Sequence, residues 1–259
     1  MSPTLLSMTE NTAPFPAKAV EEEAIGRNRL LAALPAADFA LLAPHLVEVT
    51  LDSGTLLQEQ GQPIKRVYFP HGGIVSLLGI LPEGHAVDTA TLGRDGAIGL
   101  SAGLGSRIGS SRAVVQLPLR AAQVAPARLA EVAGESRAVR DMIVRYNDIL
   151  FAQVQQAVAC NTVHHVQERL CRWLLQAHDR IDGDTVPFTQ EFLSGLLGVQ
   201  RTTVTAICRR LQDERVLDVR RGRIHIHDFG ALERKACACY RIMRRLTDQM
   251  SAPLQVTFD

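Results

Sequence analysis

Cysteine and aromatic residues are scarce in this sequence, and no cysteine precedes position 160. Aromatic residues make up 5% of the 259 residues. The five cysteines are Cys160, Cys171, Cys208, Cys237 and Cys239. Because their number is odd and three lie inside helical patterns, a disulfide framework is not expected, and a reduced, cytoplasmic protein is favoured. The longest apolar stretch, residues 74–81, is too short for a membrane span, which needs about 20 residues, so we expect no membrane partner.

The N-terminal segment lacks the pattern of a targeting sequence. Residues 1–23 have no basic start followed by an apolar core and a small-residue cleavage site. We therefore expect a disordered tail there rather than a signal peptide.

Excess charge is also lacking, since the net charge is only +1. The distribution along the chain is uneven, however. Between positions 199 and 223 there are seven arginines and three acidic residues, a local charge of +4. Local basic charge of this kind is typical of a surface that binds nucleic acid.

The same region has the pattern of a helix-turn-helix. Starting at Gln190, apolar residues recur where two packed helices need them: Leu193, Leu197, Val199, Val204 and Ile207. Ser194 is small where the helices cross, and Gly198 suits a left-handed turn between them. A β-like run, a turn over residues 220–223 and the alternating residues 224–226 then predict a β-wing. A winged helix-turn-helix places a helix in the DNA major groove.

The region from Val47 to Val124 has the alternation of short β-strands. We expect strands over residues 47–51, 67–69, 74–78, 86–92 and 113–117, separated by glycine- and proline-bearing turns, including one at residues 71–73. Such spacing is typical of a small antiparallel barrel or roll. Short helices are expected over residues 21–34, over residues 38–42 with Asp38 as the cap, and over residues 126–132.

Helical patterns dominate the rest of the chain. A long helix is expected from about Ser136 to Cys160, and further helices over residues 164–181 and 231–250. The long helix carries an apolar stripe that we assign to a dimer interface: Val139, Met142, Ile143, Tyr146, Ile149, Leu150 and Val154. The alternative is that this stripe packs on the chain's own roll.

This order of elements resembles the cyclic-AMP receptor / fumarate-nitrate regulator (Crp/Fnr) family. The motifs that carry the resemblance are residues 52–54 with Gly61 and residues 67–69 in the roll, and residues 198–204 in the helix-turn-helix. The last segment resembles the family signature G-x-S-R-E-T-V, with Gln200 and Thr202 as departures. The resemblance implies an α+β fold with a cyclic-nucleotide-binding-like β-roll, a long dimerisation helix and a winged helix-turn-helix. The expected parts are a tail (1–23), the roll (24–134), the dimerisation helix (135–160), the DNA-binding domain (161–230) and a helical extension (231–259).

The resemblance also implies roles in DNA recognition. Arg201 matches the family's guanine-reading arginine, and Thr202 replaces a glutamate, so the preferred site should differ from the family's commonest one. The expected base-reading residues are Arg201, Thr202, Thr205 and Ala206. The expected phosphate contacts are Thr189, Gln200, Thr203, Arg209, Arg210, Arg221 and Arg223. A dimer of this kind would bind a palindromic site on double-stranded DNA, with RNA polymerase as a further partner if it activates transcription.

The ligand site of the family is poorly matched. The corresponding residues are Gly99, Leu100, Ser101, Ser111, Arg112 and Ala113. Leu100 stands where a glutamate accepts the ribose hydroxyl, and Ala113 stands where a serine is usual, which argues against cyclic AMP. Another small-molecule effector, or none, stays open.

Metal and catalytic sites are not expected. The spacing of Cys237-x-Cys239 and His225-x-His227 does not resemble closed zinc motifs, and cysteines 237 and 239 would diverge on a single helix. There is no nucleophile elbow, P-loop or H-E-x-x-H motif, so we expect no enzyme. We expect a homodimeric DNA-binding regulator; the alternative is a ligand-binding signalling module that acts through protein contacts.

Overall fold

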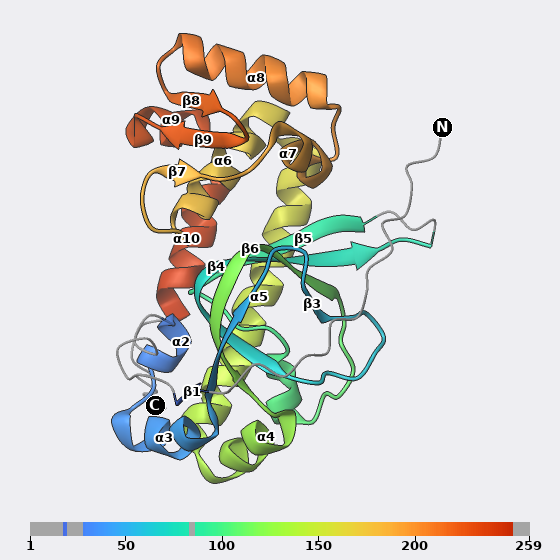
Figure 1. Cartoon of the computed structure of the whole chain (residues 1–259), viewed down its shortest axis with the longest axis vertical. Helices are drawn as coiled ribbons and strands as arrows, with labels where there is room; N and C mark the ends of the chain where they lie inside the picture. The colour runs from blue at the N-terminus through green and yellow to red at the C-terminus, as the bar shows by residue number, and fades with distance from the viewer. Residues whose placement is uncertain (1–17, 20–27, 83–85, 251–259) are drawn as a thin grey trace, which may run out of the picture.

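The structure is a computed structural model that describes residues 18–19, 28–82 and 86–250. It shows an antiparallel β-roll joined through the long helix α5 to a helical C-terminal domain (Figure 1). The expected tail lies outside the described residues except for β1 (Lys18–Ala19), which pairs with β2 (Val47–Leu51). None of the described helices is long and apolar enough to cross a membrane.

The roll is one antiparallel sheet in the order β1-β2-β6-β4-β5. Its other strands are β4 (Val67–Ile80), β5 (Ala86–Leu92) and β6 (Arg112–Val124), and β3 (Leu56–Gln58) also pairs with β6. Alternating burial along β6 fits a strand with one face in the core. The roll therefore forms as the alternating pattern predicts.

The turn expected at residues 71–73 is absent, because β4 continues through it as a single strand. The pairing of β4 with β6 shifts register between Pro70 and Val75, which is how a sheet bends at a bulge. Gly73 has a φ of 90°, and a Cβ there would lie 2.4 Å from the carbonyl oxygen of Pro118. Glycine here permits a close backbone approach inside a strand and does not end the strand.

Short helices cover one end of the roll. They are α2 (Arg29–Ala32), α3 (Ala36–Leu42), the 3-10 turns η1 (Ala43–His45) and η2 (Leu100–Leu104), and α4 (Pro126–Glu135). Asp38 lies inside the first turn of α3 and does not cap it. Its Oδ1 instead accepts a hydrogen bond from Ser136 Oγ at 2.6 Å, and Ser136 caps α5. The expected helix over 126–132 runs on through Gly134, and the helix expected over 21–34 is described only from residue 29.

Helix α5 (Arg137–Val163) packs its main apolar stripe on the roll, which corrects the predicted dimer interface. Val139, Met142, Ile143, Tyr146 and Ile149 are at most 7% exposed and share a core with η2, α4 and the strands. Leu150 packs against the same core, and Val154 is half-buried. The stripe is too well buried within one chain to form the main contact with a second copy.

The C-terminal domain contains the predicted winged helix-turn-helix. Its elements are α6 (Val166–His178), β7 (Thr185–Val186), α7 (Gln190–Leu197), α8 (Arg201–Asp213), β8 (Leu217–Arg220) and β9 (Arg223–Ile226), with the strands in the order β7-β9-β8. The single helix expected over 231–250 is instead α9 (Phe229–Lys235) and α10 (Cys239–Met250). Ala236 is extended and separates them. The boundaries expected at residues 134, 160 and 230 fall inside α4, α5 and α9.

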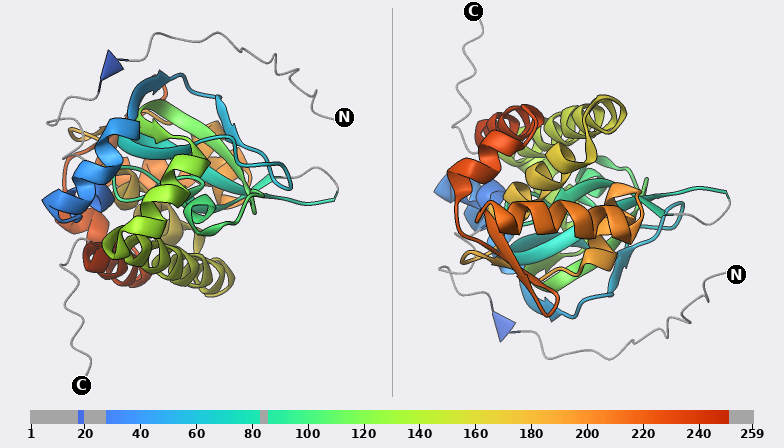
Figure 2. Two further views of the ribbon diagram at one scale, coloured as in Figure 1. Left: turned by 90° about the horizontal axis from the view of Figure 1, so that it is seen from below. Right: turned by 90° about the horizontal axis from the view of Figure 1, so that it is seen from above.

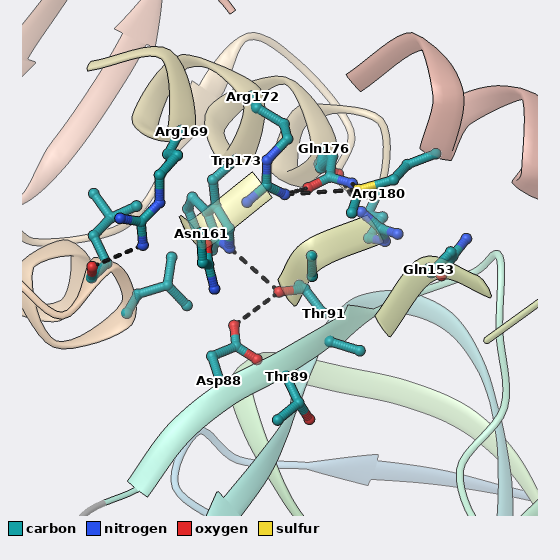
Figure 3. Close-up of a pocket in the computed structure, with 15 residues that line it drawn as sticks. Asp88, Thr89, Thr91, Gln153, Asn161, Arg169, Arg172, Trp173, Gln176 and Arg180 are labelled. Carbon is teal, nitrogen blue, oxygen red and sulfur yellow. Dashed lines mark hydrogen bonds between the residues drawn. The ribbon is translucent and has the colours of Figure 1, made fainter. Parts of the chain in front are cut away.

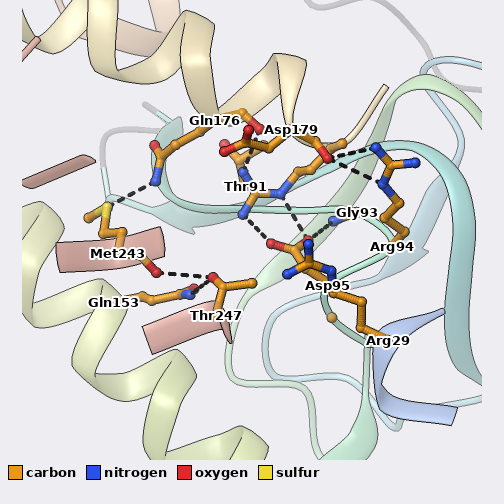
Figure 4. A network of polar contacts seen from close by, with 12 residues as sticks. Arg29, Thr91, Gly93, Arg94, Asp95, Gln153, Gln176, Asp179, Met243 and Thr247 are labelled. Atoms are coloured by element: carbon orange, nitrogen blue, oxygen red, sulfur yellow. Dashed lines mark hydrogen bonds and ion pairs between the residues drawn. The ribbon is translucent and has the colours of Figure 1, made fainter. Parts of the chain in front are cut away.

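A buried ion pair joins this domain to the roll (Figure 4). Arg180 Nη2 lies 2.6 Å from Asp95 Oδ2, and both side chains are at most 11% exposed. Arg94 donates to the carbonyl oxygen of Asp179 at 2.9 Å. A Cβ on Gly93 would lie 2.9 Å from the side chain of Arg180, so glycine allows this close packing. The position of the helix-turn-helix relative to the roll is thus fixed by specific polar contacts.

Candidate nucleic-acid interface and neighbouring sites

The two helices of the helix-turn-helix are held by their caps, their turn and a small core. Thr189 Oγ1 accepts a hydrogen bond from the Phe192 amide and caps α7. Gly198 follows α7 in the left-handed conformation (φ 66°, ψ 37°), as predicted. The buried residues between the helices are those expected: Leu193, Leu197, Val204 and Ile207, joined by Leu211. Val199 packs on them partly buried, and Ser194 is buried.

The outer face of α8 is open to solvent. This helix lies at the end of the molecule opposite α4 (Figure 1), with the wing strands beside it. Arg201, Thr202 and Ala206 are exposed, and Thr205 is half-buried, with its hydroxyl donating to Gln190 Oε1 at 2.7 Å. Arg201 Nε is 3.8 Å from Glu191 Oε2, and both side chains are at least 67% exposed. A pair this exposed stabilises little, so the guanidinium is free to change partners.

The predicted phosphate-contacting residues surround that face. Thr189, Gln200, Arg209, Arg210, Arg221 and Arg223 are exposed, and Thr203 is half-buried. Arg221 (φ 47°) and Gly222 (φ 75°) form the turn between β8 and β9, which places arginines at the tip of the wing. The structure thus puts the predicted DNA residues on one end of the domain, around α8 and the wing.

The residues aligned with the family's ligand pocket have other partners. Leu100 is 2% exposed and belongs to the core shared with α4 and α5. The guanidinium of Arg112 binds Glu59, with Nη2 2.8 Å from Oε2, and this hydrogen-bonded pair lowers the pKa of Glu59. Ala113 is fully buried, Ser111 accepts a hydrogen bond from Gln58 through its carbonyl oxygen, and Gly99 and Ser101 lie at the start of η2. Leucine packing and an internal ion pair replace the groups that would hold a ribose and a cyclic phosphate.

A polar cavity that sequence reasoning missed lies between β5 and α6 (Figure 3). Trp173 Nε1 donates to Thr91 Oγ1 at 3.2 Å, and Thr91 donates to Asp88 Oδ2 at 3.1 Å. Burial raises the pKa of Asp88 to about 7. Arg169 and Arg172 also line the cavity, and the Nε of each is buried without a hydrogen-bond partner. The cavity therefore joins a buried acid to two arginines at the contact of roll and DNA-binding domain.

Four sulfur- and nitrogen-bearing side chains gather where α5 ends, contrary to the expected divergence of cysteines 237 and 239. The group, called the Cys3His cluster below, consists of Cys160, His164, Cys237 and Cys239. Their ligand atoms all lie within 4.8 Å of one another. The break between α9 and α10 leaves Cys237 outside either helix, so that it faces the same point as Cys239. Two pairs of closely spaced residues were visible in the sequence, but their meeting depends on that break.

Comparisons with known proteins place the chain. Residues 168–235 match the family model of the Crp-like helix-turn-helix domain. FixK2 from Bradyrhizobium japonicum is similar over 74% of this chain and 98% of its own, with a TM-score of 0.65 and 16% identity. A putative Crp/Fnr-family transcriptional regulator from Eubacterium rectale is similar over 82% and 97%, with a TM-score of 0.61 and 18% identity.

A third similar structure is that of CLP, a c-di-GMP-responsive global regulator from Xanthomonas campestris. It covers 75% of this chain and 100% of its own, with a TM-score of 0.59 and 14% identity. Comparison of the sequence with curated proteins gives no match. The chain therefore has the fold of the Crp/Fnr transcription regulators, and its residues 168–235 form a Crp-like helix-turn-helix domain.

Proposed function

We propose that the protein is a sequence-specific DNA-binding transcription regulator that acts as a homodimer. The observation that carries the proposal is the exposed, arginine-bearing face of α8 on a helix-turn-helix whose caps, turn and core are complete. Arginine at the start of such a helix can donate two hydrogen bonds to a guanine edge, worth about 1–3 kcal/mol of discrimination. Arg201 is assigned that role, with Thr202, Thr205 and Ala206 beside it in the major groove.

The surrounding polar residues are assigned to the DNA backbone. Arg209 and Arg210 follow one turn or more after Arg201 on α8, and Arg221 and Arg223 lie on the wing. Thr189, Gln200 and Thr203 lie near the ends of the two helices, where amide and hydroxyl groups reach phosphates. These contacts give affinity and salt dependence, whereas the α8 contacts give sequence preference.

A second apolar face of α5 supports the dimer. Val144, Phe151 and Val158 are 45%, 64% and 63% exposed on this helix, and they follow one another at intervals of seven residues. That heptad spacing is typical of a coiled-coil contact between two copies of a helix. A two-fold dimer through this face would present two copies of α8 to a palindromic site.

The test of DNA recognition uses a site selected from random duplexes by the purified full chain. We expect Arg201→Ala to weaken binding to the selected site by about 10- to 100-fold, while binding to random DNA changes little. Arg137→Ala, which removes an exposed arginine from α5, serves as the matched control and should leave both affinities unchanged. Equal losses on selected and random DNA would remove Arg201 from base reading, and failure to select any site would overturn the proposed function.

The test of the dimer is sedimentation of Phe151→Asp. A carboxylate at the centre of the outer face of α5 should convert a dimeric chain to a monomer and weaken binding to the palindromic site. Leu41→Asp places the same charge on an exposed leucine of α3 and should leave the dimer intact. A wild-type monomer, or a Phe151→Asp dimer of unchanged stability, would contradict this interface.

The roll is assigned to a signal other than cyclic AMP. The burial of Leu100 and the Arg112–Glu59 pair support this assignment, and the Xanthomonas regulator shows that a protein of this fold can respond to c-di-GMP. Calorimetric titration with cyclic AMP should give no heat of binding at micromolar concentrations. If the regulator activates transcription, RNA polymerase is a further partner.

A further inference from the structure

The Cys3His cluster has the dimensions of a single-ion site. Cys160 Sγ and Cys237 Sγ are 3.5 Å apart, and Cys239 Sγ lies 3.6 Å from His164 Nδ1. A tetrahedral zinc ion, with bonds of about 2.3 Å to sulfur and 2.0–2.1 Å to nitrogen, sets neighbouring ligand atoms about 3.5–3.8 Å apart. Both distances therefore suit ligands that share one ion.

The chain brings the ligands together by simple local geometry. Cys160 and His164 are four residues apart at the end of α5, so they lie on one face of the helix. Cys237 and Cys239 come from the short connection between α9 and α10, and α10 runs beside α5 in both views of Figure 2. Gln156 Nε2 donates to Cys239 Sγ at 3.1 Å, the kind of outer contact that orients a thiolate ligand.

Two simpler explanations of the cluster fit less well. Buried cysteines often serve as small apolar residues, but Cys160, Cys237 and Cys239 form a cluster of their own, separate from the three larger cores. A disulfide needs a sulfur–sulfur distance of about 2.05 Å, well below the distance between Cys160 and Cys237. An iron–sulfur cluster has a core several ångströms across and would hold its ligands farther apart.

We propose that Cys160, His164, Cys237 and Cys239 bind one zinc ion in a closed, structural site. Three thiolates and one imidazole are a typical structural zinc set, and four protein ligands leave no position for a substrate or water. The thiols lose their protons when they bind the ion, so the affinity rises with pH. The charge of such a site is −1, and Arg172 lies near enough to act electrostatically on Cys160 and Cys237.

The location gives the site a specific role. α5 ends at Val163 and α6 begins at Val166, so the ligands lie at the joint between the helix assigned to the dimer and the DNA-binding domain. The zinc ion would fasten α10 to that joint and hold the angle at which the domain leaves α5. Metal binding itself does not depend on the proposed function, whereas this role in setting the angle does.

The first test measures metal in the full chain. Purified protein should contain one zinc ion per chain by mass spectrometry. After chelation, added Co²⁺ should produce the visible bands of a tetrahedral ion and a near-ultraviolet thiolate-to-cobalt band. No bound zinc together with no such cobalt spectrum would overturn the proposal. So would iron with sulfide, or a Cys160–Cys237 disulfide in freshly purified protein.

The second test uses variants with matched controls. His164→Ala removes the half-buried ligand and should lower zinc affinity at least about tenfold, and Cys237→Ser should do the same. Cys171→Ser and Cys208→Ser replace buried cysteines outside the cluster and should leave the metal content at one ion. Circular dichroism identifies any variant that fails to fold, and for such a variant the cobalt spectrum of the wild type decides.

A DNA-binding measurement separates this inference from the proposed function. His164→Ala should weaken binding to the selected DNA site, and zinc at saturating concentration should restore part of the loss. If the wild-type chain binds zinc but no DNA, the site stands and the proposed function fails. If the chain binds DNA but no metal, the reverse holds.

Discussion

The carboxyl group of Asp88 illustrates what burial does to a single residue. Its Oδ2 accepts a hydrogen bond from Thr91, while its Oδ1 is buried without a hydrogen-bond partner (Figure 3). Burial raises its pKa to about 7, and Arg172 and Arg180, which face it from α6, offset only part of that rise. The side chain therefore exchanges its proton near neutral pH, at the contact between the roll and the DNA-binding domain.

This pKa predicts how stability depends on pH. An unfolded aspartate has a pKa of about 3.9, so the folded state binds this proton more tightly and loses stability as pH rises from about 4 to about 7. Asp88→Asn should remove that loss, on the order of 2–4 kcal/mol in free energy of unfolding. Urea denaturation at a series of pH values would measure it. Asp182→Asn, at an exposed carboxylate, should keep the wild-type slope.

At the scale of an element, two glycines of the helix-turn-helix allow a comparison with one chemical change. Gly198 has a φ of 66° after α7, Gly195 is inside α7, and a Cβ at either would meet nothing within 4 Å. Gly198→Ala should lower the free energy of unfolding by about 1–2 kcal/mol, because the left-handed conformation disfavours a Cβ. Gly195→Ala should raise it by about 0.5–1 kcal/mol. Urea denaturation measures both, and effects of the same sign would contradict this account.

The same scale explains which elements can be predicted from the sequence. Gly198 and the cap Ser136 act within a few residues, so their signals are local and the helices near them are as expected. β4 was expected to break because Gly73 was taken for a turn, whereas the glycine accommodates β6 from elsewhere in the chain. α5 carries apolar residues on two faces, and periodicity alone does not tell which face meets the roll.

For the whole molecule, the Asp95–Arg180 pair is the contact whose loss should be most informative. Asp95→Ala would leave the guanidinium of Arg180 buried without its carboxylate, which costs about 3–5 kcal/mol of stability. The double variant Asp95→Ala/Arg180→Met should recover part of that loss, because no unpaired charge stays buried. Thermal and urea unfolding would compare them. Equal destabilisation by the single and double variants would contradict this explanation.

Long-range meetings such as this pair, and the Cys3His cluster, were beyond prediction from the sequence. Cys160 and Cys237 are 77 positions apart, and Asp95 and Arg180 are 85 apart. Their proximity follows from the complete fold, including the break between α9 and α10. The DNA-contacting residues were predictable because they share a few turns of one motif.

The Cys3His cluster also brings together the two ends of the Crp-like domain. The chain enters the domain just after His164 and leaves it at Cys237, so residues 165–236 form a loop that starts and ends at one place. A body attached at one place can swing about that point without stretching either connection. The contacts of Arg180 and Arg94 with the roll are what hold it at one angle, so the domain is built as a pivoted lever with a polar latch.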